Sequence, residues 1–220
     1  MCSHYQALKA GDRYRRHFGA EPPEGGAFDV WPGYSASFIR RHEQAAVGDE
    51  AVPPVESLTG VFGLVPHWAA DLGIGRRTYN ARSETVAEKP SFRDAWRRAR
   101  HCIIPADAFY EPDWSTGRAV PTRISRADGE PLGIAGLWAS WRAPGGEVVF
   151  SFTMLTINAE AHPLMRRFHK PADEKRMVVI LPEASYGEWL RVPVADSQDF
   201  LRAYPAEGLV AAVDERRTRL

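Results

Sequence analysis

The run RHCIIPADAFYE (residues 100–111) lies near the middle of the chain. Its apolar residues are typical of a buried β-strand. The run ends on Glu111, directly after the aromatic residues Phe109 and Tyr110. A carboxyl group in an apolar wall tends to have a raised pKa and can then act as a general acid or base near pH 7. The alternative is an exposed glutamate in a turn before Pro112.

Short segments on both sides of this run are also rich in β-formers and are bounded by turn residues. They comprise residues 61–65, 122–125, 132–138, 148–157 and 177–181. Helices are expected at 92–99, capped by Ser91, and at 184–190 and 197–204. The Pro- and Gly-containing segments 19–26 and 48–54 are expected to be loops. Because strands and helices do not alternate as βαβ units, we predict an α+β fold: one domain, residues 1–220, with a mixed, barrel-like sheet flanked by a few helices.

The composition is that of a globular protein. Hydrophobic residues make up 44% of the 220 residues and charged residues 25%, and 28 basic residues balance 28 acidic ones. This excludes a polybasic coating protein, an acidic tail and a disordered segment. No run of 18 apolar residues exists, and the first residues lack a signal-peptide pattern, so we expect a cytoplasmic protein without a membrane span. Only four of the 28 basic residues are lysines; arginine is suited to phosphate oxygens, although codon usage is an alternative explanation.

The chain has two cysteines, Cys2 and Cys102, too few for a disulfide scaffold. No spacing typical of a zinc site is present, and no metal or cofactor is expected. Removal of Met1 would give Cys2 a free α-amine beside its thiol, with pKa values of about 7.7–8.0 and about 8.5. Such a pair can attack an aldehyde, form a Schiff base and close a thiazolidine ring. The alternative is a frayed terminus without a role.

Three other features carry polar groups suited to chemistry. Asn80, Arg82 and Glu84 alternate, which places them on one face of a strand, either as a ligand site or as a polar strand end. His162 and His169 lie in a basic segment and could move protons near neutral pH, or be part of a solvated turn. Trp68 precedes an arginine cluster and could stack on an unpaired base, or fill the core.

Several motifs occur together in one order. They are Cys2, GLVPHW (63–68), NARSE (80–84), CIIPADAFYE (102–111), TINA (156–159) and a late His169…Arg176-Met177 pair. In this combination the sequence resembles the SRAP (SOS-response-associated peptidase) family, from Cys2 to about Leu181.

The resemblance implies a protein that crosslinks to abasic sites in single-stranded DNA through the N-terminal cysteine. It implies a thiazolidine adduct that shields the lesion, and a possible autopeptidase step that exposes the cysteine. By motif, Cys2 would be the nucleophile, Asn80 would position it or the opened sugar, and Glu111 and His169 would transfer protons. Arg82, Thr156 and Arg176 would contact phosphates, and Trp68 would flank the DNA path. No membrane contact and no obligate protein partner are expected, and a monomer is expected because covalent capture of DNA needs only one chain.

The sequence departs from the family pattern beside the proposed site. Ser3-His4 replaces the usual Gly-Arg, and Pro112 replaces a Trp. The segment between His169 and Arg176 is expanded, which keeps His162 as a competitor for the catalytic role. Two alternatives to crosslinking also remain: an amidase or peptidase that uses Cys2 as an N-terminal nucleophile, and a non-covalent single-strand binder.

Overall fold

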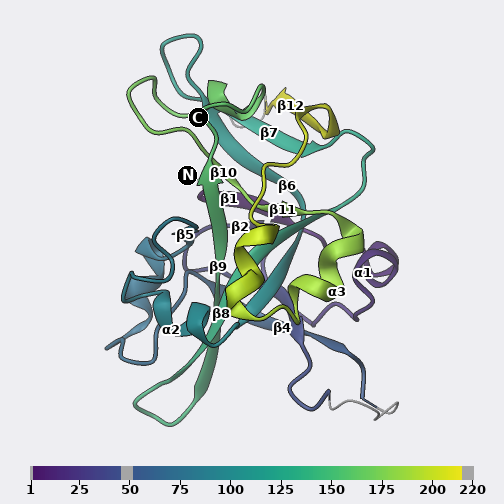
Figure 1. Cartoon of the computed structure of the whole chain (residues 1–220), viewed down its shortest axis with the longest axis vertical. Coiled ribbons are helices and arrows are strands. Elements are labelled where there is room, and N and C mark those ends of the chain that lie inside the picture. Colours follow the sequence, from purple (N-terminus) through teal and green to yellow (C-terminus); the bar gives the residue numbers. More distant parts are fainter. Residues whose placement is uncertain (1, 46–51, 215–220) are drawn as a thin grey trace.

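The structure, a computed structural model, describes residues 2–45 and 52–214 (Figure 1). Its strands are β1 (His4–Ala7), β2 (Asp29–Val30), β3 (Ser35–Arg41), β4 (Val55–Phe62), β5 (Asn80–Arg82), β6 (His101–Asp113), β7 (Val120–Arg126), β8 (Leu132–Arg142), β9 (Val148–Asn158), β10 (Arg176–Val178), β11 (Ile180–Leu181) and β12 (Leu209–Val213). Its α-helices are α1 (Gly11–Phe18), α2 (Arg93–Arg97) and α3 (Tyr186–Trp189). Short 3₁₀ turns comprise η1 (Leu72–Arg77), η2 (Met165–Arg167), η3 (Glu183–Ser185), η4 (Val194–Phe200) and η5 (Ala206–Gly208).

The sheet closes on itself. β8 pairs with β9, β9 with β4, β4 with β3, and β3 with β6, while β6 also pairs with β8. The β4–β9 and β5–β9 pairs are parallel and the others around this ring are antiparallel, so the sheet is mixed. The predicted α+β fold with a barrel-like sheet is confirmed.

Strand β6 runs through the centre of this architecture, and both of its faces are buried. Cys102 and Ile104 belong to one hydrophobic cluster, together with Phe38 and Phe152. Ile103, one residue out of phase, belongs to the second cluster. This alternation follows from the two-residue period of a strand, and it explains why the run is apolar without interruption.

The helices differ in detail from the sequence expectations. α2 begins at Arg93, beyond Ser91, without a side-chain cap, and it ends before Ala99, whose φ of 48° lies in the left-handed region. The segment expected as a helix at 184–190 forms the end of the 3₁₀ turn η3 and the one-turn α3. The segment expected at 197–204 is helical only in the 3₁₀ turn η4, which begins after Pro193 and ends before residues 201–204. The sequence reading missed α1, which packs Tyr14 and Phe18 against the second cluster.

The loop expected at 19–26 has no regular structure, and the loop expected at 48–54 lies partly outside the described residues. Within the described residues, no helix has the length and apolar character needed to cross a membrane.

Candidate active site

The N-terminal strand brings Cys2 to the end of β6. β1 pairs with β6 in antiparallel register, with Tyr5 opposite Phe109 and His4 opposite Tyr110. The chain leading back from His4 therefore runs beside Glu111. Cys2, two residues before His4, is buried at this end of β6.

Two backbone contacts hold Cys2 in place. The Asn80 Nδ2 atom donates a hydrogen bond to the Cys2 carbonyl oxygen at 2.7 Å, and the Cys2 thiol donates to the His4 carbonyl oxygen at 3.4 Å. Asn80 reaches Cys2 because β5 lies parallel to β9, with Asn80 opposite Met154. Burial, followed by the negative charge of Glu111, raises the pKa of the Cys2 thiol to about 12, so the thiol keeps its proton at neutral pH.

Glu111 and His169 form a buried pair. The Nε2 atom of His169 lies 3.4 Å from the Oε2 atom of Glu111, and the two residues are 7% and 2% exposed. Burial raises the pKa of Glu111 to about 7 and lowers the pKa of His169 to about 4, because a buried environment disfavours charge on either group. Near pH 7 the pair therefore combines a carboxyl group that can give or take a proton with a neutral imidazole.

The expanded segment after His169 folds back onto the pair. The His169 Nε2 atom lies 3.3 Å from the Arg176 carbonyl oxygen, and its backbone N–H donates to the Pro112 carbonyl oxygen at 3.0 Å. Lys175 closes the segment by donating to the carbonyl oxygens of His169 and Lys170, at 3.3 and 2.6 Å. His169 has a φ of 65°, an uncommon conformation for a residue with a side chain. The expansion therefore keeps His169 against Glu111.

A cavity of about 420 Å³ opens beside Glu111. Its walls include His4, whose ring stacks between Trp31 and Tyr110 with centroid distances of 4.2 and 4.3 Å. The His4 Nε2 atom lies 3.0 Å from a carboxylate oxygen of Asp29. The sequence did not reveal this stack: Asp29 lies in the two-residue strand β2, Trp31 directly follows it, and neither has a recognisable spacing relative to His4. The only available signal was the Ser3-His4 departure from the family pattern.

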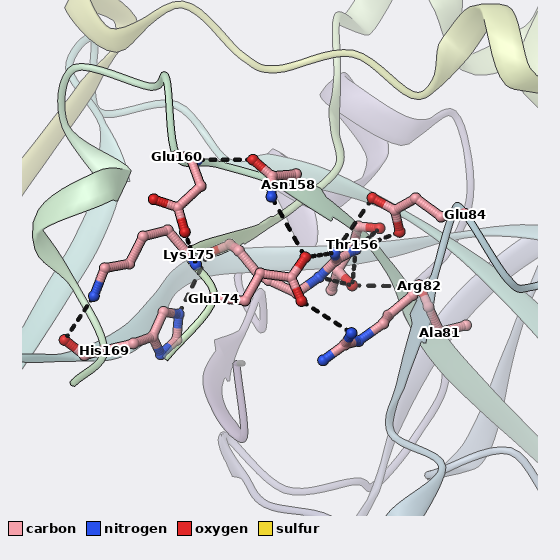
Figure 2. Close-up of polar contacts among 10 residues, drawn as sticks. Ala81, Arg82, Glu84, Thr156, Asn158, Glu160, His169, Glu174 and Lys175 are labelled. Atoms are coloured by element: carbon pink, nitrogen blue, oxygen red, sulfur yellow. Dashed lines mark hydrogen bonds and ion pairs between the residues drawn. The ribbon is translucent and has the colours of Figure 1, made fainter. Parts of the chain in front are cut away.

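The predicted phosphate contacts form a second cluster, shown in Figure 2. Arg82 lies opposite Thr156 in the β5–β9 pair, and its half-exposed guanidinium lies 2.9 Å from a Glu174 carboxylate oxygen. Arg176 lies underneath and is 1% exposed. Its guanidinium contacts Glu84 at 2.9 Å, Glu174 at 2.7 Å and the Thr156 carbonyl oxygen at 2.8 Å.

These two arginines therefore differ in accessibility. Arg82 presents surface to a ligand. Arg176 and Thr156 are both buried and in this arrangement present none. The physical reason is that two carboxylates and a backbone carbonyl occupy the Arg176 donors.

Two further residues lie apart from these clusters. His162 accepts hydrogen bonds at Nδ1 from the backbone N–H groups of Leu164 and Met165, and its Nε2 atom lies 2.8 Å from the Tyr204 carbonyl oxygen. Both ring nitrogens are therefore engaged in shaping a turn, and His169 is the histidine placed at Glu111. Trp68 is 51% exposed in the turn after β4, so it is not a core residue. Of two other tryptophans, Trp96 is buried and Trp138 is half-buried.

Comparison with known proteins adds sequence and structural relatives. The chain is 37% identical over 156 residues to a Bacillus subtilis (strain 168) protein named abasic site processing protein YoqW, covering 68% of this chain and 65% of the relative. It thus spans just under two thirds of that relative. It is 28% identical over 127 residues to mouse abasic site processing protein HMCES, covering 44% of this chain and 36% of the relative.

A crystal structure of a Bordetella bronchiseptica protein superposes with a TM-score of 0.88 at 50% identity, covering 97% of this chain and 100% of that chain. The profile of the SOS response associated peptidase (SRAP) family matches residues 1–216, nearly the whole sequence. The chain therefore belongs to the SRAP family.

Proposed function

We propose that this protein processes abasic sites in single-stranded DNA by crosslinking to them through Cys2. The observation that carries the proposal is the placement of Cys2, fixed by Asn80 and adjacent to the buried Glu111–His169 pair. The names of the relatives support the same substrate, since they are abasic site processing proteins. The proposed chemistry requires removal of Met1, because only then does Cys2 carry a free amine.

The reaction joins an aldehyde and an aminothiol. The Cys2 amine adds to C1 of the ring-opened sugar and gives a carbinolamine, which loses water to form a protonated imine. The thiol sulfur then adds to the imine carbon and releases its proton, which closes a five-membered thiazolidine ring. The net products are the cyclic adduct and one water molecule, with no oxidant or reductant involved.

Glu111 and His169 supply the proton transfers. With a pKa of about 7, a protonated Glu111 can donate to the ring oxygen of the sugar and take up the C1 hydroxyl proton as the ring opens. It can then donate again, to the hydroxyl lost from the carbinolamine. The resulting carboxylate can then accept the proton from the Cys2 thiol, which burial keeps un-ionised. In the neutral His169 the Nε2 atom carries the proton, because it faces the Arg176 carbonyl oxygen at 3.3 Å. From 3.4 Å it can orient the Glu111 carboxylate and act as a second proton donor.

The proposed path of the DNA rests on which arginine and tryptophan side chains are exposed. The half-exposed Arg82 would bind a phosphate, and this requires its guanidinium to exchange Glu174 for the ligand. Arg176 and Thr156 would support Arg82 from below by fixing Glu174 and β5. The exposed Trp68 would stack on an unpaired base. The chain as a whole would act as a monomer at the lesion, as part of the DNA damage response.

The test is an intact-mass measurement of protein freed of Met1, before and after incubation with an abasic single-stranded oligonucleotide. We expect a 1:1 adduct, lighter by one water than the sum of the two components, that survives heat and denaturant. Cys2→Ser should abolish the heat-stable adduct, because an oxygen in place of sulfur gives a less stable ring. Cys102→Ala, a change at the other buried cysteine, is the matched control and should retain it.

Other outcomes separate the alternatives. Absence of any adduct from verified N-terminal cysteine protein would overturn the proposal. Unchanged DNA binding by the wild type and by C2S, without an adduct, would identify a non-covalent binder. Turnover of an amide substrate that depends on Cys2 but not on an aldehyde would identify a peptidase.

A further inference from the structure

A second cavity lies at the opposite end of β6 from Glu111. It has a volume of about 340 Å³ and forms where α2 leads into β6. Its lining includes four arginines and no acidic residue of the described chain: Arg41, Arg98, Arg100 and Arg191. His101 and Glu111 are ten residues apart on one strand, which corresponds to roughly 30 Å along it. Figure 1 shows α2 at one end of the fold and β7, the partner of the Glu111 end of β6, at the other.

The positive charges in this cavity crowd one another. Burial, followed by the charge of Arg98, lowers the pKa of Arg100. Arg100 and Arg40 both lie over the ring of Trp138, at 4.7 and 4.2 Å from its centroid. The ring attracts both cations, but it does not neutralise them. An anion entering the cavity would relieve this repulsion.

Two carboxylates partly balance this cluster. Asp94 pairs with the lining residue Arg98 at 3.0 Å, and Glu43 pairs with the buried Arg40, beside Arg100, at 2.7 Å. Across the residues that the structure describes, Arg41, Arg100 and Arg191 form no ion pair. Their guanidinium groups come from three separate parts of the chain, β3, the α2–β6 junction and the segment after α3, and line one space. Planar guanidinium groups match the oxygens of a phosphate.

A buried histidine in the cavity wall has one ring nitrogen without a hydrogen-bond partner in the described chain. His101 is 2% exposed, and its Nε2 atom lies 3.1 Å from the Ser197 hydroxyl oxygen. The same hydroxyl lies 3.1 Å from the Pro193 carbonyl oxygen and has a single proton to donate. The other ring nitrogen, Nδ1, has no hydrogen-bond partner within the described chain. A ligand that carries both an anionic oxygen and a hydroxyl, or a ligand-bound water, would satisfy it.

The backbone between the arginines is held in an uncommon conformation. Ala99 has a φ of 48°, although it is not glycine. Hydrogen bonds fix this turn on both sides: the Ala99 N–H donates to Trp96, the Arg100 N–H to Ala95, and the Trp138 N–H to the Arg100 carbonyl oxygen, at 2.9 Å in each case. Strained backbone of this kind persists where surrounding structure determines it and is frequent at binding sites. Here it sets the directions in which Arg98 and Arg100 leave the chain.

We propose that this arginine-lined cavity is a phosphate-binding site, separate from the crosslinking site. The phosphate is either the monoester of a free nucleotide or the diester of a nucleic-acid strand. The site goes beyond the proposed crosslinking, since it shares no lining residue with the cavity at Glu111 and does not require Cys2.

The test compares two doubly substituted proteins of equal charge. R41A/R191A removes two exposed cavity arginines, and R16A/R97A removes two exposed arginines outside the cavity. The probes are inorganic phosphate and a nucleoside 5′-monophosphate, measured by calorimetry, and an undamaged single-stranded oligonucleotide, measured by fluorescence anisotropy. We expect R41A/R191A to weaken the binding of at least one probe about tenfold or more. The affinity of R16A/R97A for the same probe should differ from that of the wild type by less than about twofold.

The probes also distinguish the two sources of phosphate. Weakened binding of phosphate and nucleotide identifies a free monoester, and weakened binding of the oligonucleotide alone identifies a diester. Equal weakening by both double variants, or no binding of any probe to the wild type, overturns the proposal. An independent readout uses the wild type alone: the ¹⁵N shift of His101 Nδ1 should move on saturation with the bound probe. The adduct assay with abasic DNA, run in parallel, reports separately on the proposed crosslinking.

Discussion

The Nε2 atom of His169 lies 3.4 Å from the Oε2 atom of Glu111, inside a wall of buried side chains. Burial holds the pKa of Glu111 at about 7 and that of His169 at about 4. The carboxyl group is thus the member of the pair that changes its protonation state in the physiological range, while the imidazole stays neutral. Both the pH dependence of the reaction and that of stability follow from this relationship.

Replacing Glu111 by glutamine should slow adduct formation about 100-fold or more, because a general acid is lost. The Cys2 amine also titrates near pH 8, so the informative quantity is the ratio of wild-type to E111Q rates at each pH. This ratio should fall as pH rises through about 7, where Glu111 loses its proton. Single-turnover adduct formation from pH 5.5 to 9 measures it. A ratio that is constant with pH would exclude Glu111 as the acid.

The same substitution should change how stability depends on pH. Folding raises the Glu111 pKa from 4.5 to about 7, so the folded state retains this proton longer than the unfolded state, and the free energy of unfolding falls as pH rises through that window. His169, lowered from 6.5 to about 4, acts in the opposite sense in both proteins. The stability of E111Q relative to wild type should therefore grow between pH 4.5 and 7, by up to about 3 kcal/mol. Urea denaturation at several pH values tests this; parallel curves would contradict it.

Alanine substitutions of the two candidate histidines should have different effects. His169→Ala should slow adduct formation by about 100-fold, since it removes the group at Glu111. His162→Ala should instead lower the free energy of unfolding by about 2–3 kcal/mol, because two backbone N–H groups and the Tyr204 carbonyl lose their partner. Adduct rates and thermal melts of both variants provide the comparison. A folded H162A protein that no longer forms the adduct would assign the proton-transfer role to His162 instead of His169.

Asn80→Ala should slow adduct formation by about tenfold, because the Cys2 carbonyl loses the 2.7 Å hydrogen bond that fixes the reactive residue. Stability should fall by about 1–2 kcal/mol. Asn158→Ala, which removes an exposed amide 3.4 Å from Glu174, is the control and should leave the rate unchanged. Equal rates for wild type and N80A would show that Asn80 does not position Cys2.

Substitution of Arg82 should affect DNA binding, whereas substitution of Arg176 should affect the stability of the fold. Arg82→Ala should weaken binding of single-stranded DNA and reduce the slope of log affinity against log salt by about 1, as expected for one lost phosphate contact. Arg176→Ala should destabilise the protein by about 2–4 kcal/mol, since Glu84, Glu174 and Thr156 lose a buried partner. Salt titrations of DNA binding and denaturation curves of both variants test these two expectations. A lower salt slope in a fully stable R176A protein would show that Arg176 contacts phosphate directly.

The sequence predicted the strands more successfully than the helices. Segments such as residues 148–157 have the apolar, β-branched character of strands, and the structure has β9 at Val148–Asn158. The predicted bounds of the C-terminal helices were wrong. The one or two turns between Pro193 and Pro205 are determined by packing rather than by helical periodicity. β3 was missed because its residues, SASFIRR, combine polar and apolar types that only the β4 pairing explains.

The sequence by itself determined the family and the mixed α+β sheet, and it predicted roles for Cys2 and Glu111, because these are read from local pattern and position in the chain. Only the tertiary structure decided that His169 rather than His162 meets Glu111, that Arg176 is buried under Arg82, and that arginines from three separate parts of the chain line one cavity. These relationships depend on strand register and long-range pairing, which bring together residues separated by tens of positions. The local sequence does not specify which of several similar side chains will come into contact in the folded protein.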